Sequence, residues 1–518
     1  MRLINLCLTL VSLLLPLTSF SDDTILESHP QLHQITLDPR LSYEQYNMPN
    51  HIDSLGVIGL HALVDLNKTF YSGLGLYSAV KGESGGYFAL ALEGGLQHQL
   101  WKQWLVDGGA RIGGGGGRNT PVGGGLFIEP YAGLKYDFGP FRAGAYYSYI
   151  NFVDGAIASQ QVGVELSMPA VFNYVTMPDT TPSMHFSDLK YSFVRYLGST
   201  ENYFAGLVRA YLPNPGITTT AHQPMESNFE FIGIEAAHYF SDYVFLFFNF
   251  AGAFHGHQNG YADELLGLGY RFPLLDMLDG IIKLGVGSGG GGAVNTGGGF
   301  IYEPMVGLEY RVNQKLGIEL NAGYVQAPRA NFQAKEVSVL VKYYLSDAVL
   351  APTSKGLHEY IQAKRQSYLA PWRIRLLNQT YFKPYSSVGT TNPTMELLGA
   401  DFDYFVSRYF YFTGQTAFAY VGRKTGGYFS GLLGFGAKTP LFLQKKINLF
   451  AEILAGTAGG AGLDIGQGAL YEPVLGVDYR ITDAWGLQAS VGRLMAFQGK
   501  FRSTTLNGGI SYRFWSIT

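Results

Sequence analysis

The chain alternates apolar and polar residues over many short stretches, and one such stretch occurs three times. The copies are Gly123–Phe138, Gly297–Val312 and Gly466–Ile481, and each carries a Glu-Pro pair at the same position. The three shared glutamates are spaced 174 and 169 residues apart. Because successive side chains of a strand point to opposite faces, strict alternation predicts a strand with two different faces. The chain is therefore expected to contain three units built on one pattern.

The first copy shows what the two faces carry. Ile128, Leu134 and Tyr136 lie on one face, while Glu129 and Lys135 lie on the other. An apolar face toward lipid and a mostly polar face toward an interior are typical of transmembrane β-barrels. The pattern thus predicts an all-β fold, an antiparallel transmembrane β-barrel.

Comparable strands of about ten residues, a length that crosses a bilayer at a tilt, recur along the chain. We expect about 24 strands, eight in each unit, because eight such alternating segments can be placed in every unit. The first strand of each unit is expected near residues 40–48, 188–197 and 372–383. The predicted divisions are residues 22–170 for the first barrel repeat, 171–346 for a linker and the second repeat, and 347–518 for a linker and the third repeat.

Four stretches depart from the strand pattern. Pro169–Ser187 is rich in Pro and Thr, and Ser346–Pro371 contains Gly356–Leu369, which has the spacing of a short helix. Both lie where units meet, so we interpret them as linkers, and the polar residues 22–39 precede the first unit in the same way. Ser199–Asn228 is a long insertion that we assign to an outside loop, with room for a hidden strand or pair.

Residues 1–21 have the pattern of a signal peptide. Arg2 supplies the positive end, Leu3–Leu17 the apolar run, and Ser21 closes a small-x-small cleavage site. Cleavage near Ser21 would remove Cys7, the only cysteine of the chain, so the mature protein would form no disulfide.

Composition agrees with an exported membrane barrel. Charged residues make up 14% of the chain, against about 25% in ordinary soluble domains, while aromatic residues reach 15%. The sequence after the signal contains no apolar run of 18 residues, which excludes helical membrane spans. Its 39 acidic residues slightly exceed its basic ones, which argues against a nucleic-acid partner. A secreted β-sandwich or β-solenoid is the other fold that alternation allows, but its exposed faces would carry more Lys and Glu.

The end of the chain carries a recognisable signal. Asn507, Gly509, Tyr512 and Phe514 follow the order polar-x-Gly-x-x-aromatic-x-aromatic. This order resembles the terminal signal of bacterial outer-membrane β-barrel proteins. The resemblance is to the class as a whole and to no specific family. It implies delivery to the barrel-insertion machinery, outer-membrane lipid as the surroundings, and a Gram-negative cell envelope as the location.

Connections between the expected strands differ in length. Those after odd-numbered strands are longer and rich in glycine, as in Gly113–Gly125, Ser288–Gly299 and Gly456–Gly468. Outer-membrane barrels have short periplasmic turns and longer outside loops. We therefore expect these glycine-rich loops outside the cell and both chain ends in the periplasm.

Charged residues on the polar faces are the candidate site. Two sets recur in the three units, namely the glutamates of the Glu-Pro pairs and a polar residue two positions after a shared glycine. The candidates are Glu129, Glu303, Glu472, His61, Glu235, Asp401, Lys135, Glu309, Asp478, Arg311 and Arg480. Lumen charges select ions or solutes in some barrels. In a small barrel they form a satisfied network instead, because an unpaired buried charge is costly.

Other chemistry finds little support in the sequence. The glycine runs lack the Gly-Lys-Ser/Thr ending of a phosphate-binding loop. His255 and His257 have metal-like spacing without a third ligand, and no Ser/His pair recurs across the units. We therefore expect no metal, no cofactor and no enzymatic activity.

The expected function is that of an integral outer-membrane barrel with a structural or surface-binding role, with an extracellular ligand reached through the outside loops. A porin-like channel through one wide lumen is the first alternative, and a lipid-modifying enzyme is the second. The choice depends on closure, because eight strands enclose room only for side chains. Inward glycines and apolar groups favour three small tandem barrels over one 24-stranded barrel.

Overall fold

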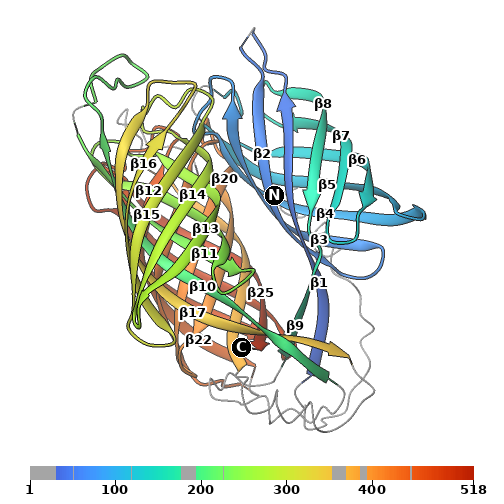
Figure 1. Ribbon diagram of the computed structural model, residues 1–518. Coiled ribbons are helices and arrows are strands. Elements are labelled where there is room, and N and C mark those ends of the chain that lie inside the picture. The colour runs from blue at the N-terminus through green and yellow to red at the C-terminus, as the bar shows by residue number, and fades with distance from the viewer. Residues whose placement is uncertain are drawn as a thin grey trace.

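The computed structural model describes residues 31–50, 52–117, 120–176, 194–225, 227–352, 369–384, 394–443 and 446–517. They form 25 strands, all paired antiparallel (Figure 1). The signal peptide predicted for residues 1–21 lies outside the described residues. So does the helix predicted within Gly356–Leu369, except for Leu369, which begins a strand.

The strands close into three rings of eight. Barrel 1 consists of β1 (Gln31–Tyr46), β2 (Leu55–Asp65), β3 (Phe70–Lys81), β4 (Phe88–Trp101), β5 (Trp104–Gly116), β6 (Phe127–Asp137), β7 (Arg142–Phe152) and β8 (Ala158–Ser167). Barrel 2 consists of β10 (Val194–Pro213), β11 (Phe229–Tyr239), β12 (Val244–His255), β13 (Ala262–Leu275), β14 (Leu278–Gly290), β15 (Phe300–Arg311), β16 (Leu316–Gln326) and β17 (Gln333–Pro352). Barrel 3 consists of β18 (Leu369–Phe382), β19 (Met395–Phe405), β20 (Phe410–Val421), β21 (Phe429–Lys438), β22 (Ile447–Gly459), β23 (Ala469–Arg480), β24 (Trp485–Ala496) and β25 (Arg502–Ile517).

Each ring is sealed by pairing between its first and last strands. These pairs are β1 with β8, β10 with β17, and β18 with β25. The preference for three small barrels is therefore confirmed, and the single wide barrel does not form. Closure removes the sheet edges, so every strand finds backbone partners on both sides.

The faces of the strands are inverted relative to a soluble protein. In β8, Val162 and Val164 are 69% and 53% exposed, whereas Gln161 and Glu165 are buried. The same alternation runs along β6 and β24. Apolar side chains outside and polar side chains inside are what a lipid-facing barrel requires, because the lipid offers polar groups no partners. No helix in the described part of the chain is long and apolar enough to span a membrane.

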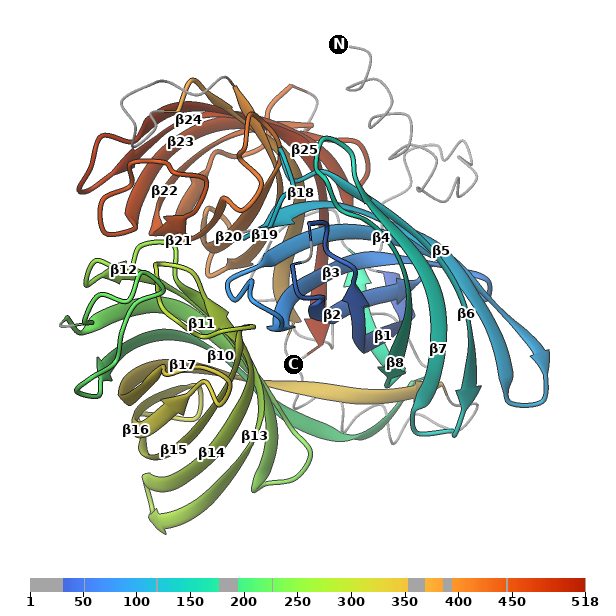
Figure 2. The ribbon, with the colours of Figure 1, turned by 90° about the horizontal axis from the view of Figure 1, so that it is seen from above.

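The three barrels stand side by side, as the view from above shows (Figure 2). One end of each barrel carries short turns, such as the two residues between β4 and β5. We call it the turn end, and the opposite end, with the glycine-rich connections, the loop end. The chain enters β1 and leaves β25 at the turn end.

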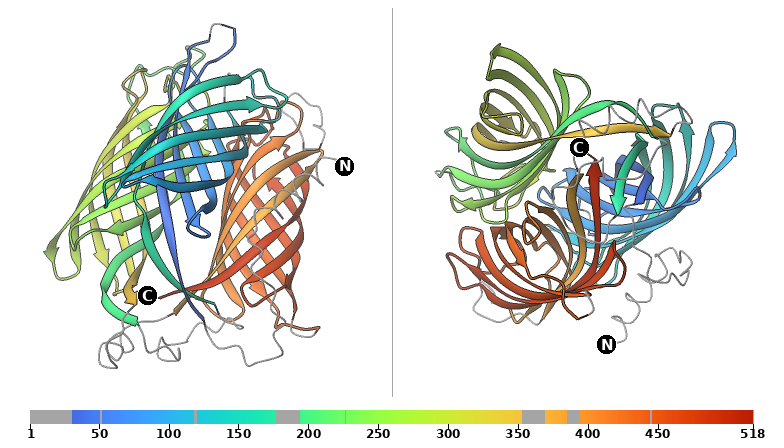
Figure 3. Two further views of the ribbon diagram at one scale, coloured as in Figure 1. Left: turned by 90° about the vertical axis from the view of Figure 1, so that its right-hand side faces the viewer. Right: turned by 90° about the horizontal axis from the view of Figure 1, so that it is seen from below.

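A twenty-fifth strand ties barrel 1 to barrel 3 at the turn end. β9 (Ala170–Thr176) pairs with Gln31–Leu37 of β1, and its residues Tyr174 and Val175 pair with β25. The two barrels are thereby one continuous hydrogen-bonded sheet, and β9 lies between their lower ends, where Figure 1 labels it and the left view of Figure 3 shows it again. Two predictions are wrong here. Residues 31–39 are strand rather than irregular chain, and the linker that we expected after barrel 1 begins with β9. The two segments pair with each other, so each satisfies the backbone hydrogen bonds of the other.

The first strand of barrel 2 also differs from the prediction. It runs over Val194–Pro213 instead of 188–197, so Ser199–Pro213 is barrel wall and not an outside loop. Tyr203, Leu207 and Tyr211 point into the barrel and are buried, which satisfies the alternation over a longer stretch than we expected. The strand hidden in the insertion and the expected strand are one strand, β10, so barrel 2 still has eight strands. The connection at the loop end is confined to residues 214–228, of which residue 226 lies outside the described residues.

The β9 contact contains a histidine that predicts pH-dependent stability. His33 stacks on Tyr174 at 5.1 Å between ring centres, and its Nε2 lies 2.8 Å from Thr176 Oγ1. Tyr174 in turn accepts a hydrogen bond from Tyr512 of barrel 3 at 3.0 Å. This segment extends beyond the end of β2, outside the barrel wall. Burial lowers the pKa of His33 below its ordinary value.

Because the unfolded chain binds a proton at His33 more readily than the folded one, stability should fall as the pH drops below about 6.5. We expect the denaturant midpoint of the protein to decrease between about pH 7.5 and about pH 5, and the His33→Asn variant to show a smaller decrease. The His98→Gln variant, at an exposed position of β4, is the control and should behave as the wild type. Equal pH dependence in H33N and wild type would contradict the assignment.

Candidate functional site

The repeated glutamate of barrel 1 lies at the centre of an ion-pair network. Glu129 is completely buried, and Arg111 Nη1 lies 3.3 Å from both Glu129 Oε2 and Glu44 Oε1. Glu44 also accepts a hydrogen bond from Ser148. The guanidinium stands over the Tyr131 ring at 4.6 Å, so its remaining surface meets an aromatic face.

A second group fills barrel 1 toward the turn end. Arg40 contacts Asp38 and Asp107, each at 2.8 Å. Lys135, a sequence candidate, contacts Glu165 at 2.8 Å and also Asp107. Cations and carboxylates from β1, β5, β6 and β8 therefore meet in this part of the interior.

Barrel 2 repeats the arrangement with different residues. Arg209 bridges Glu303, at 2.9 Å, and Asp263. Deeper in the barrel two lysines each join two carboxylates. Their contacts are Lys283 with Glu235 and Glu319, both at 2.6 Å, and Lys342 with Glu309, at 2.8 Å, and Glu319. Arg311 lies at the rim of this cluster, 2.9 Å from Glu309.

Barrel 3 relies on arginine. Arg375 reaches Asp401 at 3.3 Å, Asp403 at 2.8 Å and Glu452 at 2.9 Å. Asp478 pairs with Arg513, and Arg480 is buried with 7% of its surface exposed. Glu472 differs from its two counterparts, because it accepts a hydrogen bond from Thr505 instead of meeting an arginine.

The structure thus brings the sequence candidates together within barrels and keeps them apart between barrels. The three repeated glutamates belong to three separate interiors and form no shared lumen. Their cationic partners Arg111 and Arg209 were not singled out as partners from the sequence. Their inward positions follow from the alternation, but the pairing joins residues up to 94 positions apart, and no local pattern reveals it.

Barrel 1 also contains a serine–histidine–glutamate array. Ser42 Oγ lies 2.8 Å from His61 Nε2, and His61 Nδ1 lies 2.6 Å from Glu93 Oε1. Gly59 makes room for it, since a Cβ there would lie 2.6 Å from Ser42 Oγ. The order and distances match those of a hydrolase triad. All three side chains are buried, however, and the equivalent positions Glu235 and Asp401 form ion pairs instead.

The glycine-rich loops join the barrels at the loop end. In each barrel, the loop between the third and fourth strands contacts the loop between the fifth and sixth strands of the next barrel. One hydrogen bond joins each pair of loops: Gly85 N donates to Gly297 O at 2.9 Å, Gly256 N to Gln467 Oε1 at 3.4 Å, and Gly426 N to Gly123 O at 3.1 Å. Barrel 1 therefore contacts barrel 2, barrel 2 contacts barrel 3, and barrel 3 contacts barrel 1. Such head-to-tail contacts close into a ring, as in a cyclic trimer.

Glycine is required where these loops touch. A Cβ on Gly459 of barrel 3 would lie 1.9 Å from the Cα of Gly260 in barrel 2, and one on Gly290 would lie 2.3 Å from Gly86 N. Backbone meets backbone at these places without room for a side chain. Where the three sets of loops converge they surround a cavity of about 770 Å³, lined by Gly86, Thr120, Val122, Asp154, Asn259, Gly292, Lys424, Gly427, Phe429 and neighbouring residues.

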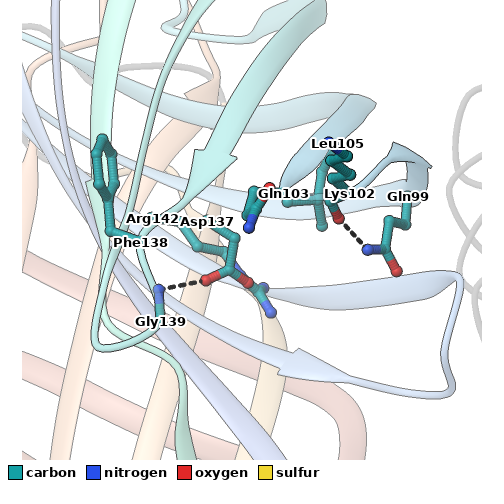
Figure 4. A pocket seen from close by; sticks show the side chains of 8 residues that line it. All are labelled: Gln99, Lys102, Gln103, Leu105, Asp137, Phe138, Gly139 and Arg142. Atoms are coloured by element: carbon teal, nitrogen blue, oxygen red, sulfur yellow. Dashed lines mark hydrogen bonds and ion pairs between the residues drawn. The ribbon is translucent and has the colours of Figure 1, made fainter.

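A smaller cavity of about 460 Å³ opens at the turn end of barrel 1 (Figure 4). It lies between the β4–β5 and β6–β7 turns. Asp137 holds its shape by accepting hydrogen bonds from Gly139 N at 2.7 Å and Arg142 Nε at 3.1 Å. Lys102 at the rim stands 5.0 Å from the Trp101 ring.

The terminal signal occupies β25 with the alternation that its class implies. Asn507 and Gly509 face the interior, where Asn507 Nδ2 donates to Ser490 Oγ at 3.2 Å. Tyr512 and Phe514 point outward and pack against Tyr174 of β9. The pair of outward aromatics therefore lies at the turn end.

No family model and no curated protein matches this chain. Among solved structures, a de novo designed transmembrane β-barrel matches 29% of this chain and 99% of its own, with 14% identity and a TM-score of 0.20. The Pseudomonas aeruginosa ferric enterobactin receptor PfeA in complex with BCV-L6 covers 92% of this chain and 81% of its own, with 10% identity and a TM-score of 0.27. Pseudomonas aeruginosa OccK2 (OpdF) in complex with glucuronate covers 94% and 96%, with 10% identity and a TM-score of 0.22.

With identities of 14% or less and TM-scores below 0.3, these likenesses carry no argument about the class, ligand or activity of this chain.

The contacts between loops predict the effect of a single methyl group. We expect Gly459→Ala to lower the unfolding free energy by about 1–3 kcal/mol, because the added Cβ must separate the loops of barrels 2 and 3. Gly508→Ala is the matched control, since a Cβ there meets no atom within 4 Å. Denaturant unfolding of both variants in the same detergent measures the difference. Equal stability of G459A and G508A would show that the loops do not pack in this way.

Proposed function

We propose that this protein is an integral protein of the bacterial outer membrane with a structural or surface-binding role, and that it is not a diffusion pore. The observation that carries the proposal is the filling of each barrel interior by paired charges. Arg111, Arg209 and Arg375 are all at most 2% exposed, and each touches carboxylates from other strands. An eight-stranded ring has room for these side chains and little more.

Apolar outward faces, the terminal aromatic signal and the export signal support the location. The loop end then faces outside the cell, as the rule of short periplasmic turns and longer outside loops implies. The cavity of about 770 Å³ where the three barrels meet is the natural place for an extracellular ligand, because it opens among backbone groups and the charged side chains Asp154 and Lys424. The barrels below it act as a rigid support.

Electrical recording separates this role from the porin-like alternative. We expect the purified protein to show no steady conductance in planar lipid bilayers, because each interior is occupied by its own ion-pair network. A porin from the same preparation host serves as the positive control. Stable conductance steps would contradict the proposal, above all if replacing Glu129, Glu303 and Glu472 by glutamine changed their ion selectivity.

A second candidate function rests on the Ser42–His61–Glu93 array, whose distances fit a serine hydrolase. We propose instead that it is a structural counterpart of the ion pairs at Glu235 and Asp401, because an acyl donor has to reach Ser42 Oγ and that residue is 2% exposed. We therefore propose that the protein is not an enzyme.

Active-site labelling tests this assignment. We expect a fluorophosphonate probe to leave the folded protein unlabelled, in detergent and in vesicles. Labelling that disappears in Ser42→Ala and in His61→Gln would establish hydrolase activity and overturn the structural assignment. The Ser490→Ala variant, which removes a serine from the interior of barrel 3, controls for nonspecific reaction.

A further inference from the structure

The surfaces that join the three barrels below the loops are apolar. Phe88 of barrel 1, Phe250 of barrel 2 and Phe429 of barrel 3 meet one another, with ring centres 5.7–6.4 Å apart. Ala262, Ala400 and other outward-facing residues complete the same buried cluster. Lipid is therefore excluded from the line where the barrels meet.

One carboxyl group lies in this apolar boundary. On β13, Asp263 and Leu265 point into barrel 2, so Glu264 between them points outward, toward barrel 1. Glu264 is 1% exposed. Its neighbour across the sheet is Ser288 of β14, whose hydroxyl donates to the carbonyl of Ala79 in β3 at 2.5 Å. This part of barrel 2 is thus pressed directly against the third strand of barrel 1.

The Glu264 carboxyl faces the completely buried hydroxyl of Ser78 in barrel 1, and the two side chains interact. No hydrogen bond of ordinary geometry forms to either carboxyl oxygen or to the Ser78 hydroxyl. A Gly-Tyr pair precedes the fourth strand of every barrel, and Glu264 lies three residues after it. The corresponding residues are Leu90 in barrel 1 and Gly431 in barrel 3. The three boundaries therefore differ at this point, and one of them contains an acid.

No counter-charge faces Glu264 from the elements packed around it, within the part of the chain that the structure describes. Phe250 of β12 and Ser288 of β14 are its neighbours across the sheet, and Ser78 of β3 faces it. Leu74, Leu76 and Leu90 belong to the apolar cluster of the same boundary. The charged groups on the same strands point elsewhere. Asp263 binds Arg209 inside barrel 2, Glu93 binds His61 inside barrel 1, and Lys81 donates to Gln45 at the end of β3.

From this arrangement we propose that Glu264 is a proton-operated latch between barrels 1 and 2. The protonated acid fits the dry boundary, where its hydroxyl can donate to Ser78 or its carbonyl accept from it. The carboxylate does not fit, because its charge would be sealed at an apolar boundary with no cation beside it. Loss of the proton therefore loosens this boundary and leaves the other two closed, which makes the spacing of the outside loops of barrels 1 and 2 depend on pH.

Distance measurements between spin labels test the latch in the full-length protein. Cys7 is the only cysteine, so a Cys7→Ser background carries only introduced labels. One pair, Glu83→Cys with Arg329→Cys, reports on exposed loops of barrels 1 and 2, and a second pair, Arg329→Cys with Gln498→Cys, reports on barrels 2 and 3. Raising the pH from about 7 to about 10, across the range where a desolvated carboxyl ionises, should lengthen or broaden the first distance only.

Two variants decide the outcome. Glu264→Gln retains the shape without an ionisable group, and Glu264→Leu copies barrel 1 at Leu90, so in either variant the first distance should be the same at both pH values. The proposal is overturned if the wild type shows no change in the first distance, or if E264Q and E264L change as the wild type does. A change of both distances in all three proteins would likewise contradict it, since that would reflect general loosening.

Discussion

An eight-stranded ring encloses a space that only side chains can fill, and the rest of this structure follows from that constraint. Every inward position must be apolar or must find a partner within its own barrel. The strands of this chain carry many inward charges, so cations and carboxylates from neighbouring and opposite strands have to meet inside each barrel. Arg111 with Glu129 and Glu44, and Lys283 with Glu235 and Glu319, satisfy the requirement in different ways. Breaking one such pair leaves a buried charge, which costs more than the pair contributes.

The second constraint concerns the outside of the barrels, where they touch. Apolar side chains facing lipid give little reason for barrels to associate, because lipid is as apolar as they are. Close backbone approach and hydrogen bonds supply that reason here. Gly459 against Gly260, and the bond from Gly85 N to Gly297 O, bring main chains together at distances that any side chain would prevent. In each barrel the loop between the third and fourth strands contacts one neighbour and the loop between the fifth and sixth contacts the other, so three barrels on one chain close the ring.

The sequence predicts the barrel wall well, because alternation is a local property of each strand. In β8 every outward valine and inward polar residue can be assigned from the pattern alone. It fails at β9 and over Ser199–Pro213 of β10. These segments pair with partners far away in the chain, Gln31–Leu37 for β9 and Ala334–Ala348 for this part of β10. The site residues likewise fall into those that the local pattern predicts and those that it does not. Inward charges such as Glu303 follow from alternation, whereas their partners, and the position of Glu264 between two barrels, depend on closure and packing.

The three barrels share their loops more closely than their interiors. Gly86-Tyr87, Gly260-Tyr261 and Gly427-Tyr428 occupy the same place in each ring, yet the interiors differ. His61 pairs with Glu93 where the second barrel has Glu235 with Lys283, and the third has Asp401 with Arg375. A solute pathway or a catalytic centre repeated three times would need the same chemistry at the same depth. Networks of buried charges that only fill a barrel can differ from one barrel to the next, because each has only to pair its own charges. What the barrels hold in common is therefore the geometry that brings their loops together at the loop end.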